Sequence, residues 1–462
     1  MKEQGERKHF ASKIGIILAT AGSAVGLGNI WRFPVEIGSN GGAAYMLVYL
    51  LSVLMLGLPL MTAEFMVGRR AHSNTGTAFK HVTKNRFWGR VGMMGVFTGW
   101  FIMCYYAVVS GWVLDYLVEA LTGKFNRIGA DGNAEVYTEN FENFVANPWM
   151  PVVYMAAFVL LSHYIITRGV QKGIERCARL LMPLLFIILV LLAVCSLTTE
   201  GAGKGLKFLF RLDFSGFTYR SVLSAVGQSF YSLSIGMGCI CTFASYFSRD
   251  THLVGTAVKV VSLDTLVALL ASVMIFPVVF TAGIDPAAGP SLVFIALPNV
   301  FQQAFGEWPV VCYVISVAFY FFLVIATLTS LISLHEVPTA YLSEELNISR
   351  RAAATIVTVV CIVIGSLCSL SMGVLSDFKV LGRNLFDFFD FTSGQIFLPI
   401  SGLLIALFVG HIMKRDEFFD EVSNQGTLGS STAKLLMFSL RYFVPILIIL
   451  IFLSGIGVFD WF

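Results

Sequence analysis

Two short runs of glycine and polar residues interrupt stretches of the chain that are otherwise apolar. The first, 22–29, reads Gly-Ser-Ala-Val-Gly-Leu-Gly-Asn, and the second, 234–238, reads Ser-Ile-Gly-Met-Gly. Because a glycine costs a helix about 1 kcal/mol relative to alanine, each run predicts an unwound turn. Unwound carbonyl groups can bind a hard cation such as sodium, and free N–H groups at the start of a helix can bind a carboxylate. The two runs therefore suit a cation together with a zwitterion such as an amino acid.

Glycine pairs of this kind also occur where two helices pack closely through small residues. A single run would favour that interpretation. Two runs at corresponding positions, each beside a polar residue, Asn29 or Ser232, favour a binding site instead. Paired interruptions of apolar helices are typical of transporters built from an inverted repeat, in which the site lies near the midplane of the membrane.

The composition indicates that membrane helices position these runs. Of the 462 residues, 56% are hydrophobic and only 13% are charged, and the mean hydropathy is +0.79. A soluble domain has about 25% charged residues, so the chain is predicted to be a polytopic membrane protein. Disordered, collagenous, disulfide-rich and nucleic-acid-binding classes are excluded, the last because the net charge is only +3. The eight cysteines lie in or beside apolar segments, where we expect them to pack as small apolar side chains.

A helix that crosses a bilayer needs about 20 mostly apolar residues. Eleven stretches meet this requirement: 12–38, 42–68, 90–120, 150–167, 176–198, 219–246, 255–281, 309–342, 353–371, 385–413 and 434–458. We therefore predict an all-α integral membrane protein with 11 transmembrane helices. The connections 121–149 and 199–218 are polar loops, and the proline-containing connection 282–308 is expected to form a re-entrant or short helical lid.

Lys and Arg favour the cytoplasmic side of a membrane, and most of the 31 lie in segments on the same side as the N-terminus. We therefore expect a cell (inner) membrane protein with a cytoplasmic N-terminus and an extracellular or periplasmic C-terminus. The expected divisions are 1–11, the cytoplasmic N-terminus; 12–198, the first inverted repeat; 199–218, an extracellular loop; 219–413, the second inverted repeat; 434–458, one extra helix; and 459–462, the extracellular C-terminus.

Several motifs resemble one family of membrane transporters. Residues 26–34 read Gly-Leu-Gly-Asn-Ile-Trp-Arg-Phe-Pro and 40–42 read Asn-Gly-Gly, as in the first helix of the neurotransmitter:sodium symporters. Residues 228–234, Gln-Ser-Phe-Tyr-Ser-Leu-Ser, resemble the sixth helix of that family, and 326–330, Ala-Thr-Leu-Thr-Ser, resemble the eighth. The resemblance runs from about residue 7 to residue 413. It implies a 5+5 inverted repeat with discontinuous helices 1 and 6; the lack of a twelfth helix matches the bacterial amino-acid transporters of the family.

The resemblance also implies two sodium sites made of oxygen atoms. The first would use the Ala24 carbonyl, the Asn29 amide oxygen, the Ser232 carbonyl and hydroxyl, the Asp264 carboxylate and the carboxylate of the substrate. The second would use the carbonyls of Gly22, Val25 and Ala326 and the hydroxyls of Thr329 and Ser330. Judged from their positions alone, Thr329 and Ser330 would instead bond to carbonyls one turn earlier in their own helix.

A substrate site between the two interruptions is implied in the same way. Its residues would be Ala24, Leu27, Gly28, Ile102, Tyr106, Tyr231, Ser232, Ser234, Met237, Ser330 and Leu334. The substrate carboxylate would meet the Leu27 and Gly28 amides and the Tyr106 hydroxyl. Tyr231 departs from the usual Phe, and Met237 is an adaptable wall. We expect a neutral, hydrophobic or aromatic L-amino acid.

Charged residues at the two ends of this site are expected to form gates. Arg32 lies inside the first span, where a charge costs about 2.5–3.5 kcal/mol, and the resemblance implies Asp390 as its partner in an outer gate. An inner gate would pair Arg7 with Glu344 near Tyr246. The plug of this inner gate would be Phe10.

Two further features of the spans have a predicted role. Glu64 lies in the second span and is expected to accept hydrogen bonds from the unwound backbones. Gly173 and Pro183, ten residues apart at one end of the fifth span, predict either a plain kink or a turn that unwinds to let water reach the second sodium site.

The leading hypothesis is a symporter that couples sodium entry to amino-acid uptake by alternating access. The alternative is an amino-acid-sensing or loosely coupled channel-like protein of the same fold, and sodium-dependent uptake into proteoliposomes separates the two. We do not expect an enzyme, because the histidines are isolated and neither a His-Glu-x-x-His motif nor a phosphate-binding loop is present.

A last expectation concerns chloride, which animal members of the family bind near the first sodium site. Tyr49, Gln228 and Ser232 would supply the matching donors here. The position that is usually Asn in those proteins is Asp264, whose fixed negative charge would replace chloride and repel it. Uptake is therefore expected to be chloride-independent, and Asp264 is expected to accept a proton for the return step after sodium leaves.

Overall fold

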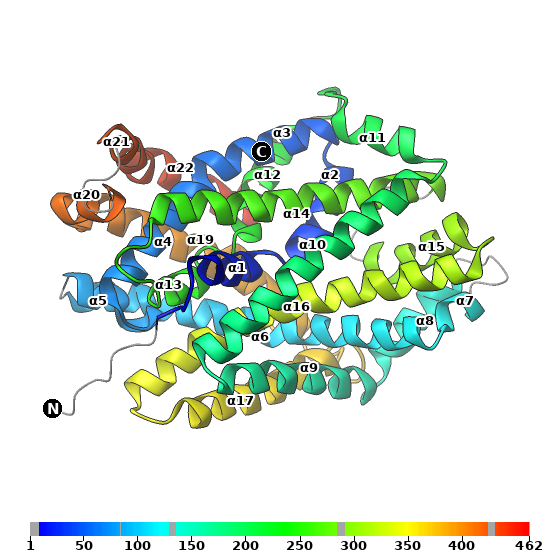
Figure 1. The fold of residues 1–462 in the computed structure, drawn as a ribbon, viewed down its shortest axis with the longest axis horizontal. Coiled ribbons are helices and arrows are strands. Elements are labelled where there is room, and N and C mark those ends of the chain that lie inside the picture. The colour runs from blue at the N-terminus through cyan, green and yellow to red at the C-terminus, as the bar shows by residue number, and fades with distance from the viewer. Residues whose placement is uncertain (1–8, 84, 129–134, 284–291, 424–429, 462) are drawn as a thin grey trace.

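The computed structural model describes residues 9–83, 85–128, 135–283, 292–423 and 430–461. The described residues form one bundle of helices, most of which run along the long axis of the molecule (Figure 1). In this part of the chain, the only extended pairing is a single bridge between Val380 and Arg383. The predicted all-α class is therefore confirmed.

The α-helices follow one another along the chain as α1 (Lys13–Ala24), α2 (Phe33–Ser39), α3 (Ala43–Ser52), α4 (Leu58–Ala71), α5 (Thr75–Thr83), α6 (Arg86–Leu121), α7 (Lys124–Ile128), α8 (Glu135–Ala146), α9 (Met150–Thr167), α10 (Arg176–Leu197), α11 (Ala202–Phe210), α12 (Tyr219–Ser232), α13 (Cys239–Ala244), α14 (Leu253–Thr281), α15 (Leu297–Phe305), α16 (Pro309–Glu345), α17 (Arg350–Leu370), α18 (Leu385–Phe391), α19 (Leu398–Leu407), α20 (Arg415–Ser423), α21 (Ser430–Phe438) and α22 (Val444–Gly455). Wider π-helical turns extend several of them, at Gly28–Arg32, Val53–Gly57, Val170–Glu175, Leu292–Ala296, Thr392–Phe397, Phe408–Ile412 and Ser439–Phe443. A 3₁₀ turn covers Val458–Trp461.

Nine helical segments among the described residues are long and apolar enough to cross a membrane. They are Ala43–Ala71, Arg86–Leu121, Met150–Thr167, Val170–Leu197, Leu253–Thr281, Pro309–Glu345, Arg350–Leu370, Leu385–Ile412 and Ser431–Gly455. The bent pair Lys13–Ala24 and Gly28–Ser39 brings the number to ten if it is one span. The chain is therefore a multi-pass membrane protein.

Both predicted interruptions are present in the backbone. After α1 the chain unwinds at Val25, which is extended with ψ 111°, and it bends by 55° before the helix resumes. Between α12 and α13 the residues Ser234, Gly236 and Gly238 have φ of 53°, 84° and 80°. Left-handed backbone cannot continue a right-handed helix, and glycine adopts it without the steric cost that other residues carry. The two glycines therefore determine where the second interruption lies.

The connections are more helical than expected. The predicted polar loops 121–149 and 199–218 contain α7, α8 and α11. In the connection 282–308 the helix α15 agrees with the predicted lid, whereas residues 284–291 lie outside the described residues. All eight cysteines are free, and six of them are buried.

Long helices around the interruptions provide the frame for the site. The helix α1 packs against α10, α14 and α16, while α13 packs against α4 and α16. The helices α6, α9, α16 and α17 also pack on one another and lie side by side in the lower half of Figure 1. Both interruptions are therefore enclosed by helices rather than exposed at the surface.

Candidate functional site

Side chains from distant helices satisfy the carbonyl groups that the first interruption frees. Three carbonyls of this segment each accept a hydrogen bond from such a side chain, because an unpaired polar group buried at this depth would cost several kcal/mol. Of the three, Gly28 O also accepts a backbone hydrogen bond from Phe33 N. The bonds are from Ser234 Oγ to Ser23 O (2.8 Å), from Ser330 Oγ to Val25 O (3.0 Å) and from Gln228 Nε2 to Gly28 O (2.9 Å).

A buried carboxylate lies next to the first interruption, where the first sodium site was expected. Asp264 on α14 is fully buried. Its two oxygens accept hydrogen bonds from Asn29 Nδ2 and Ser232 Oγ, both at 2.8 Å. Among the described residues no Lys or Arg forms an ion pair with Asp264. A buried carboxylate with only neutral donors is electrostatically incomplete, so the cluster fits a bound cation.

The orientation of Asn29 differs from the expected one. Its amide nitrogen faces Asp264, and its oxygen accepts a hydrogen bond from the Gly26 N–H at 3.1 Å. The expected sodium ligand was this oxygen. The Tyr49 hydroxyl donates to Ser232 Oγ at 3.4 Å, so the expected neighbours of the first site do meet.

The two hydroxyls expected in the second sodium site behave differently. Ser330 reaches across to Val25 O, as described above. Thr329 instead donates to its own helix, to Ile325 O at 3.2 Å and Ala326 O at 3.0 Å. The bond within the helix, which the position alone predicted, is therefore observed at Thr329 and not at Ser330. Gly22 lies close to Thr329, since a Cβ at Gly22 would be 3.3 Å from the Thr329 Cβ.

A cavity of about 40 Å³ lies between the two interruptions. It is lined by Ser23, Ala24, Gly26, Leu27, Gly28, Ile102, Tyr106, Tyr231, Ser232, Ser234, Met237, Ser330 and Leu334. All eleven residues expected at the substrate site are among them. Because small-molecule sites are typically about 300–1,000 Å³, a ligand with a large side chain requires some of these residues to move.

Two cavity residues, Ser23 and Gly26, were not predicted. A Cβ at Gly26 would lie 2.6 Å from Ser330 Oγ and 3.1 Å from Tyr106 Oη, so glycine there keeps the cavity open. The hydroxyls of Ser23 and Tyr106 are buried without a hydrogen-bond partner among the described residues. Buried unpaired hydroxyls that line a cavity indicate that a polar ligand completes the site.

The second interruption is stabilised by one carboxylate. Glu64 on α4 is fully buried. Its oxygens accept hydrogen bonds from Gly236 N at 2.6 Å and Cys241 N at 3.2 Å. The predicted role of Glu64 as an acceptor for unwound backbone is confirmed.

At the outer side of the cavity the expected ion pair is not formed. Arg32 lies with its guanidinium 4.6 Å from the ring centroid of Tyr231, and its Nε is 3.9 Å from Glu36 Oε1. Asp390 is close enough to interact electrostatically with Arg32, but the two do not approach within 4.0 Å. In this conformation a cation over an aromatic face and a carboxylate four residues later in the helix stabilise Arg32. The pairing of Arg32 with Asp390 stays a prediction for the closed outer gate.

On the inner side, one of the two expected gate partners can be placed. Arg7 lies outside the described residues. Glu344 accepts hydrogen bonds from the backbone and side chain of Asn74 at 2.8 and 3.0 Å. Phe10 packs on Phe243, Tyr246 and Phe247 with ring centroids 6.0–6.4 Å apart, as the predicted apolar plug would.

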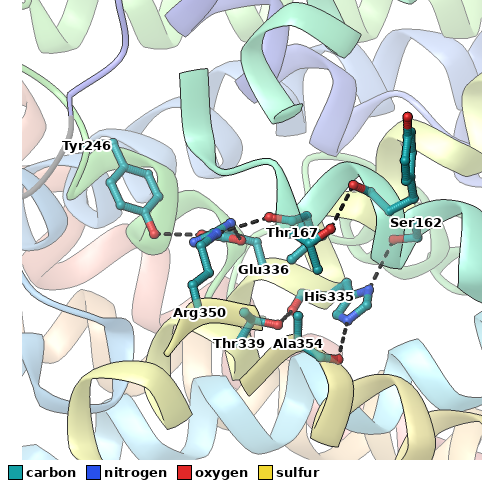
Figure 2. A network of polar contacts seen from close by, with 10 residues as sticks. Ser162, Thr167, Tyr246, His335, Glu336, Thr339, Arg350 and Ala354 are labelled. Carbon is teal, nitrogen blue, oxygen red and sulfur yellow. Dashed lines mark hydrogen bonds and ion pairs between the residues drawn. The ribbon is translucent and has the colours of Figure 1, made fainter. Parts of the chain in front are cut away.

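Tyr246 belongs to a polar cluster that the sequence did not predict. Its hydroxyl donates to Glu336 Oε1 at 2.7 Å, and both oxygens of Glu336 accept hydrogen bonds from Arg350 (Figure 2). Arg350 also donates to Ile166 O at 3.0 Å. The cluster therefore joins α9, α16, α17 and the segment after α13. Glu336 could have been found from the sequence, since an acidic residue deep in an apolar helix requires a partner.

The start of the fifth span is wider than an α-helix. Gly173 lies in the π-helical turn Val170–Glu175, and a Cβ there would be 2.1 Å from Ile165 O. Glu175, also in this turn, accepts hydrogen bonds from Ala11 N at 2.7 Å and Ser12 Oγ at 2.8 Å. The turn is thus tied to the N-terminal segment, and Pro183 lies within a continuous α10.

The chain matches a known family model and known relatives over almost its whole length. The model described as "Sodium:neurotransmitter symporter family" matches residues 7–143 and 137–460. An uncharacterized sodium-dependent transporter, YhdH, of Bacillus subtilis (strain 168) is 36% identical over 453 residues, which are 98% of each chain. The sodium-dependent neutral amino acid transporter B(0)AT2 of Bos taurus is 27% identical over 304 residues, or 59% of this chain and 40% of the relative.

A solved structure is similar in both fold and sequence. The crystal structure of MhsT in complex with L-phenylalanine has a TM-score of 0.88 and 42% sequence identity to this chain. The match covers 97% of this chain and 100% of that one. The arrangement of helices around the cavity is therefore shared with a protein that was crystallised with an aromatic amino acid.

Proposed function

The chain belongs to the sodium:neurotransmitter symporter family, and we propose that it imports a neutral, hydrophobic or aromatic L-amino acid together with sodium. The observation that carries this proposal is the cavity between the two interruptions, beside the buried Asp264 carboxylate. It offers backbone and hydroxyl groups for a zwitterion at one end and an electrostatically incomplete carboxylate for a cation. Relatives named for neutral amino acids and for bound L-phenylalanine support the substrate class.

Eleven spans in an inverted repeat would give the transport cycle its geometry. Joining α12 and α13 into one interrupted span adds an eleventh to the ten counted above. The first five spans and the next five would then form the two halves of a 5+5 repeat, with residues 434–458 as the extra helix. The N-terminus would lie in the cytoplasm and the C-terminus outside, in a cell membrane.

Two sodium ions would use the oxygen atoms around the first interruption. One would lie between Asp264, Ser232 and Asn29, with the Asn29 amide turned so that its oxygen faces the ion. The other would lie near Gly22, Val25 and Ser330, where the Ser330 hydroxyl would exchange its bond to Val25 O for the cation. In both places hydrogen bonds between neutral groups would give way to ion–oxygen contacts.

Closing and opening of the two sides would alternate around this site. Outer closure would bring Arg32 from Glu36 toward Asp390 above Tyr231. Inner opening would separate Tyr246 from Glu336 and withdraw Phe10. The hydrogen bonds among Tyr246, Glu336 and Arg350 support an inner side that is closed while Arg32 and Asp390 are still apart.

Sodium-dependent uptake tests this function directly. Purified protein in proteoliposomes should accumulate labelled L-phenylalanine only when sodium is high outside, and competition by the other natural amino acids should rank the substrates. Uptake without a sodium gradient would contradict symport. Sodium-stimulated binding without any accumulation would instead favour a sensor or a loosely coupled channel of the same fold.

Chloride-independence follows from the fixed charge of Asp264. Replacing chloride with gluconate should leave uptake by the wild type unchanged, because the carboxylate already supplies the negative charge beside sodium. The variant Asp264→Asn should lose uptake and regain part of it when chloride is added. A wild type that stops without chloride would contradict the proposal.

A further inference from the structure

A second, wider cavity lies at the end of the bundle where α17 begins. This end of α17 is on the left in Figure 1. The cavity lies where α9 ends and where the fifth span and α17 begin, and its volume is about 610 Å³. Its lining residues are His163, Tyr164, Thr167, Arg168, Lys172, Arg176, Arg351 and Thr355. We call it the basic pocket. It contributes nothing to the substrate site.

Among the residues that the structure describes, four cations line the basic pocket and no acidic residue does. Arg168, Lys172, Arg176 and Arg351 are all exposed, and none forms an ion pair with an acidic residue in the described part of the chain. The neighbouring Glu175 is buried and accepts hydrogen bonds from the N-terminal segment. The pocket therefore concentrates positive charge that the protein itself does not neutralise.

Another cavity at the same end of the molecule shows that this excess charge is specific to one place. That cavity is lined by Arg69, Arg70 and Arg249, but also by Asp420 and Glu421. Arg69 Nε donates to Glu421 at 2.8 Å, and Arg70 is 3.6 Å from the same carboxylate. A general preference for Lys and Arg on one side of a membrane explains the cations of both cavities, but not why those of the basic pocket lack partners.

Apolar surface continues from the basic pocket toward the middle of the membrane. Leu160 lies one helical turn from Tyr164, Leu180 one turn from Arg176, and Val359 one turn from Thr355. The exposed fractions of these three apolar side chains are 52%, 69% and 53%, respectively. Residues four apart lie on the same face of a helix. Each wall of the pocket thus passes directly from polar or charged side chains to exposed apolar ones, an arrangement that matches a ligand with an anionic head and apolar tails.

We propose that the basic pocket binds the headgroup phosphate of an anionic phospholipid, whose acyl chains lie along α9, α10 and α17. Arg168, Arg176 and Arg351 present planar guanidinium groups that bind phosphate oxygens in pairs. The Arg168 guanidinium lies 4.2 Å from the Tyr164 ring centroid, which orients it before the lipid arrives. Basic pockets between transmembrane helices suit such headgroups because each cation near an anionic surface adds to the attraction.

The basic pocket shares its walls with the polar cluster at the inner closure. His163 Nδ1 is 2.9 Å from Thr358 Oγ1, which is 3.3 Å from His335 Nε2, and His335 precedes Glu336 in the chain. Figure 2 shows His335 beside the pair formed by Glu336 and Arg350. The first turn of α17 therefore directs Arg350 inward to Glu336 and Arg351 outward to the lipid. A bound headgroup fixes this turn against α9 and favours the closed inner side.

The test compares lipid binding by the full chain in detergent with binding by two charge variants. Arg176→Gln with Arg351→Gln removes one cation from each of two helices of the basic pocket. Lys80→Gln with Arg86→Gln is the matched control, since both residues are exposed at the same end outside the pocket. Phosphatidylglycerol and phosphatidylcholine are the probes, measured by retained lipid in native mass spectrometry and by the rise in melting temperature.

Phosphatidylglycerol should bind the wild type and the control alike, and the pocket variant about tenfold or more weakly. Equal binding of phosphatidylcholine, or equal binding by the pocket variant, would overturn the proposal. Glycerol phosphate and inorganic phosphate form a separate arm: if either raises the melting temperature as much as the lipid does, the ligand is a soluble anion and the lipid assignment is wrong. These readouts need no transport, so they stand apart from the test of symport.

Discussion

The two helix interruptions are stabilised in opposite ways, the first by side chains that donate hydrogen bonds and the second by a side chain that accepts them. At the first, freed carbonyls such as Ser23 O and Val25 O accept hydrogen bonds from neutral hydroxyls. At the second, freed N–H groups of Gly236 and Cys241 donate to the carboxylate of Glu64. A hydroxyl that donates to a carbonyl can turn away and leave both oxygens to a cation, whereas a backbone N–H group can only donate and keeps its need for an acceptor such as the Glu64 carboxylate. We therefore expect the first interruption to exchange ligands and the second to act as a fixed support.

The largest effect should follow from removing the support of the second interruption. Glu64→Ala leaves two buried N–H groups without an acceptor, and hydrogen bonds to charged groups contribute about 1.5–3 kcal/mol each. The variant should lose about 3 kcal/mol or more of stability, measured as a lower melting temperature in detergent. Glu64→Gln, which keeps one oxygen, should lose less. If Glu64→Ala had the same melting temperature as the wild type, the second interruption would not depend on Glu64 as a fixed support.

A glycine substitution tests whether the backbone shape of the second interruption is essential. Gly236 has φ 84°, so Gly236→Ala should lower the free energy of unfolding by about 1–2 kcal/mol. Its Cβ would also lie 3.0 Å from Leu398 O. Gly227→Ala is the matched control, because that glycine lies within α12 and its Cβ would meet only an ordinary contact at 3.7 Å. Equal melting temperatures for the two variants would mean that the left-handed turn is not required.

Loss of ligands at the first interruption should change sodium binding more than stability. Asn29→Ala and Ser330→Ala should each weaken sodium affinity at least tenfold, about 1.4 kcal/mol, in sodium-dependent binding of labelled L-phenylalanine. Ser333→Ala is the control, since the Ser333 hydroxyl bonds only to Ser330 O in its own helix. Unchanged sodium dependence in both variants would exclude these residues from the sodium sites.

The smallest effect is expected at the outer gate. Arg32 and Asp390 do not touch in this conformation, so their substitutions should be additive in melting temperature. In transport, where the outer side must close, a double-mutant cycle of Arg32→Gln and Asp390→Asn should show a coupling energy above about 0.5 kcal/mol. Additivity in transport as well would mean that the two residues never meet.

The sequence was most informative where local backbone energetics decide the structure. The glycine runs located both interruptions, and hydropathy located the spans that the described residues contain. Every expected substrate residue lines the cavity. Seven of them lie in or next to the two interruptions, whereas Ile102, Tyr106, Ser330 and Leu334 lie on α6 and α16 and were expected only from the resemblance. Gly26 and Ser23 were missed although they lie within the same run, since nothing in a sequence tells which face of an unwound turn meets a cavity.

Side-chain partners were decided by the tertiary structure alone. Thr329 and Ser330 are adjacent residues whose hydroxyls could both bond to carbonyls of their own helix. Only Ser330 donates to Val25 O instead, because its position around the axis of α16 directs its side chain at the first interruption. Arg32 lies over Tyr231 rather than beside Asp390 for a similar reason: several partners of comparable energy lie within reach, and helix packing selects among them. Hydropathy thus determined which segments span the membrane, and the glycine runs determined where two of the helices are interrupted. Which atoms meet there depends on how the helices turn against one another, a property of the whole bundle.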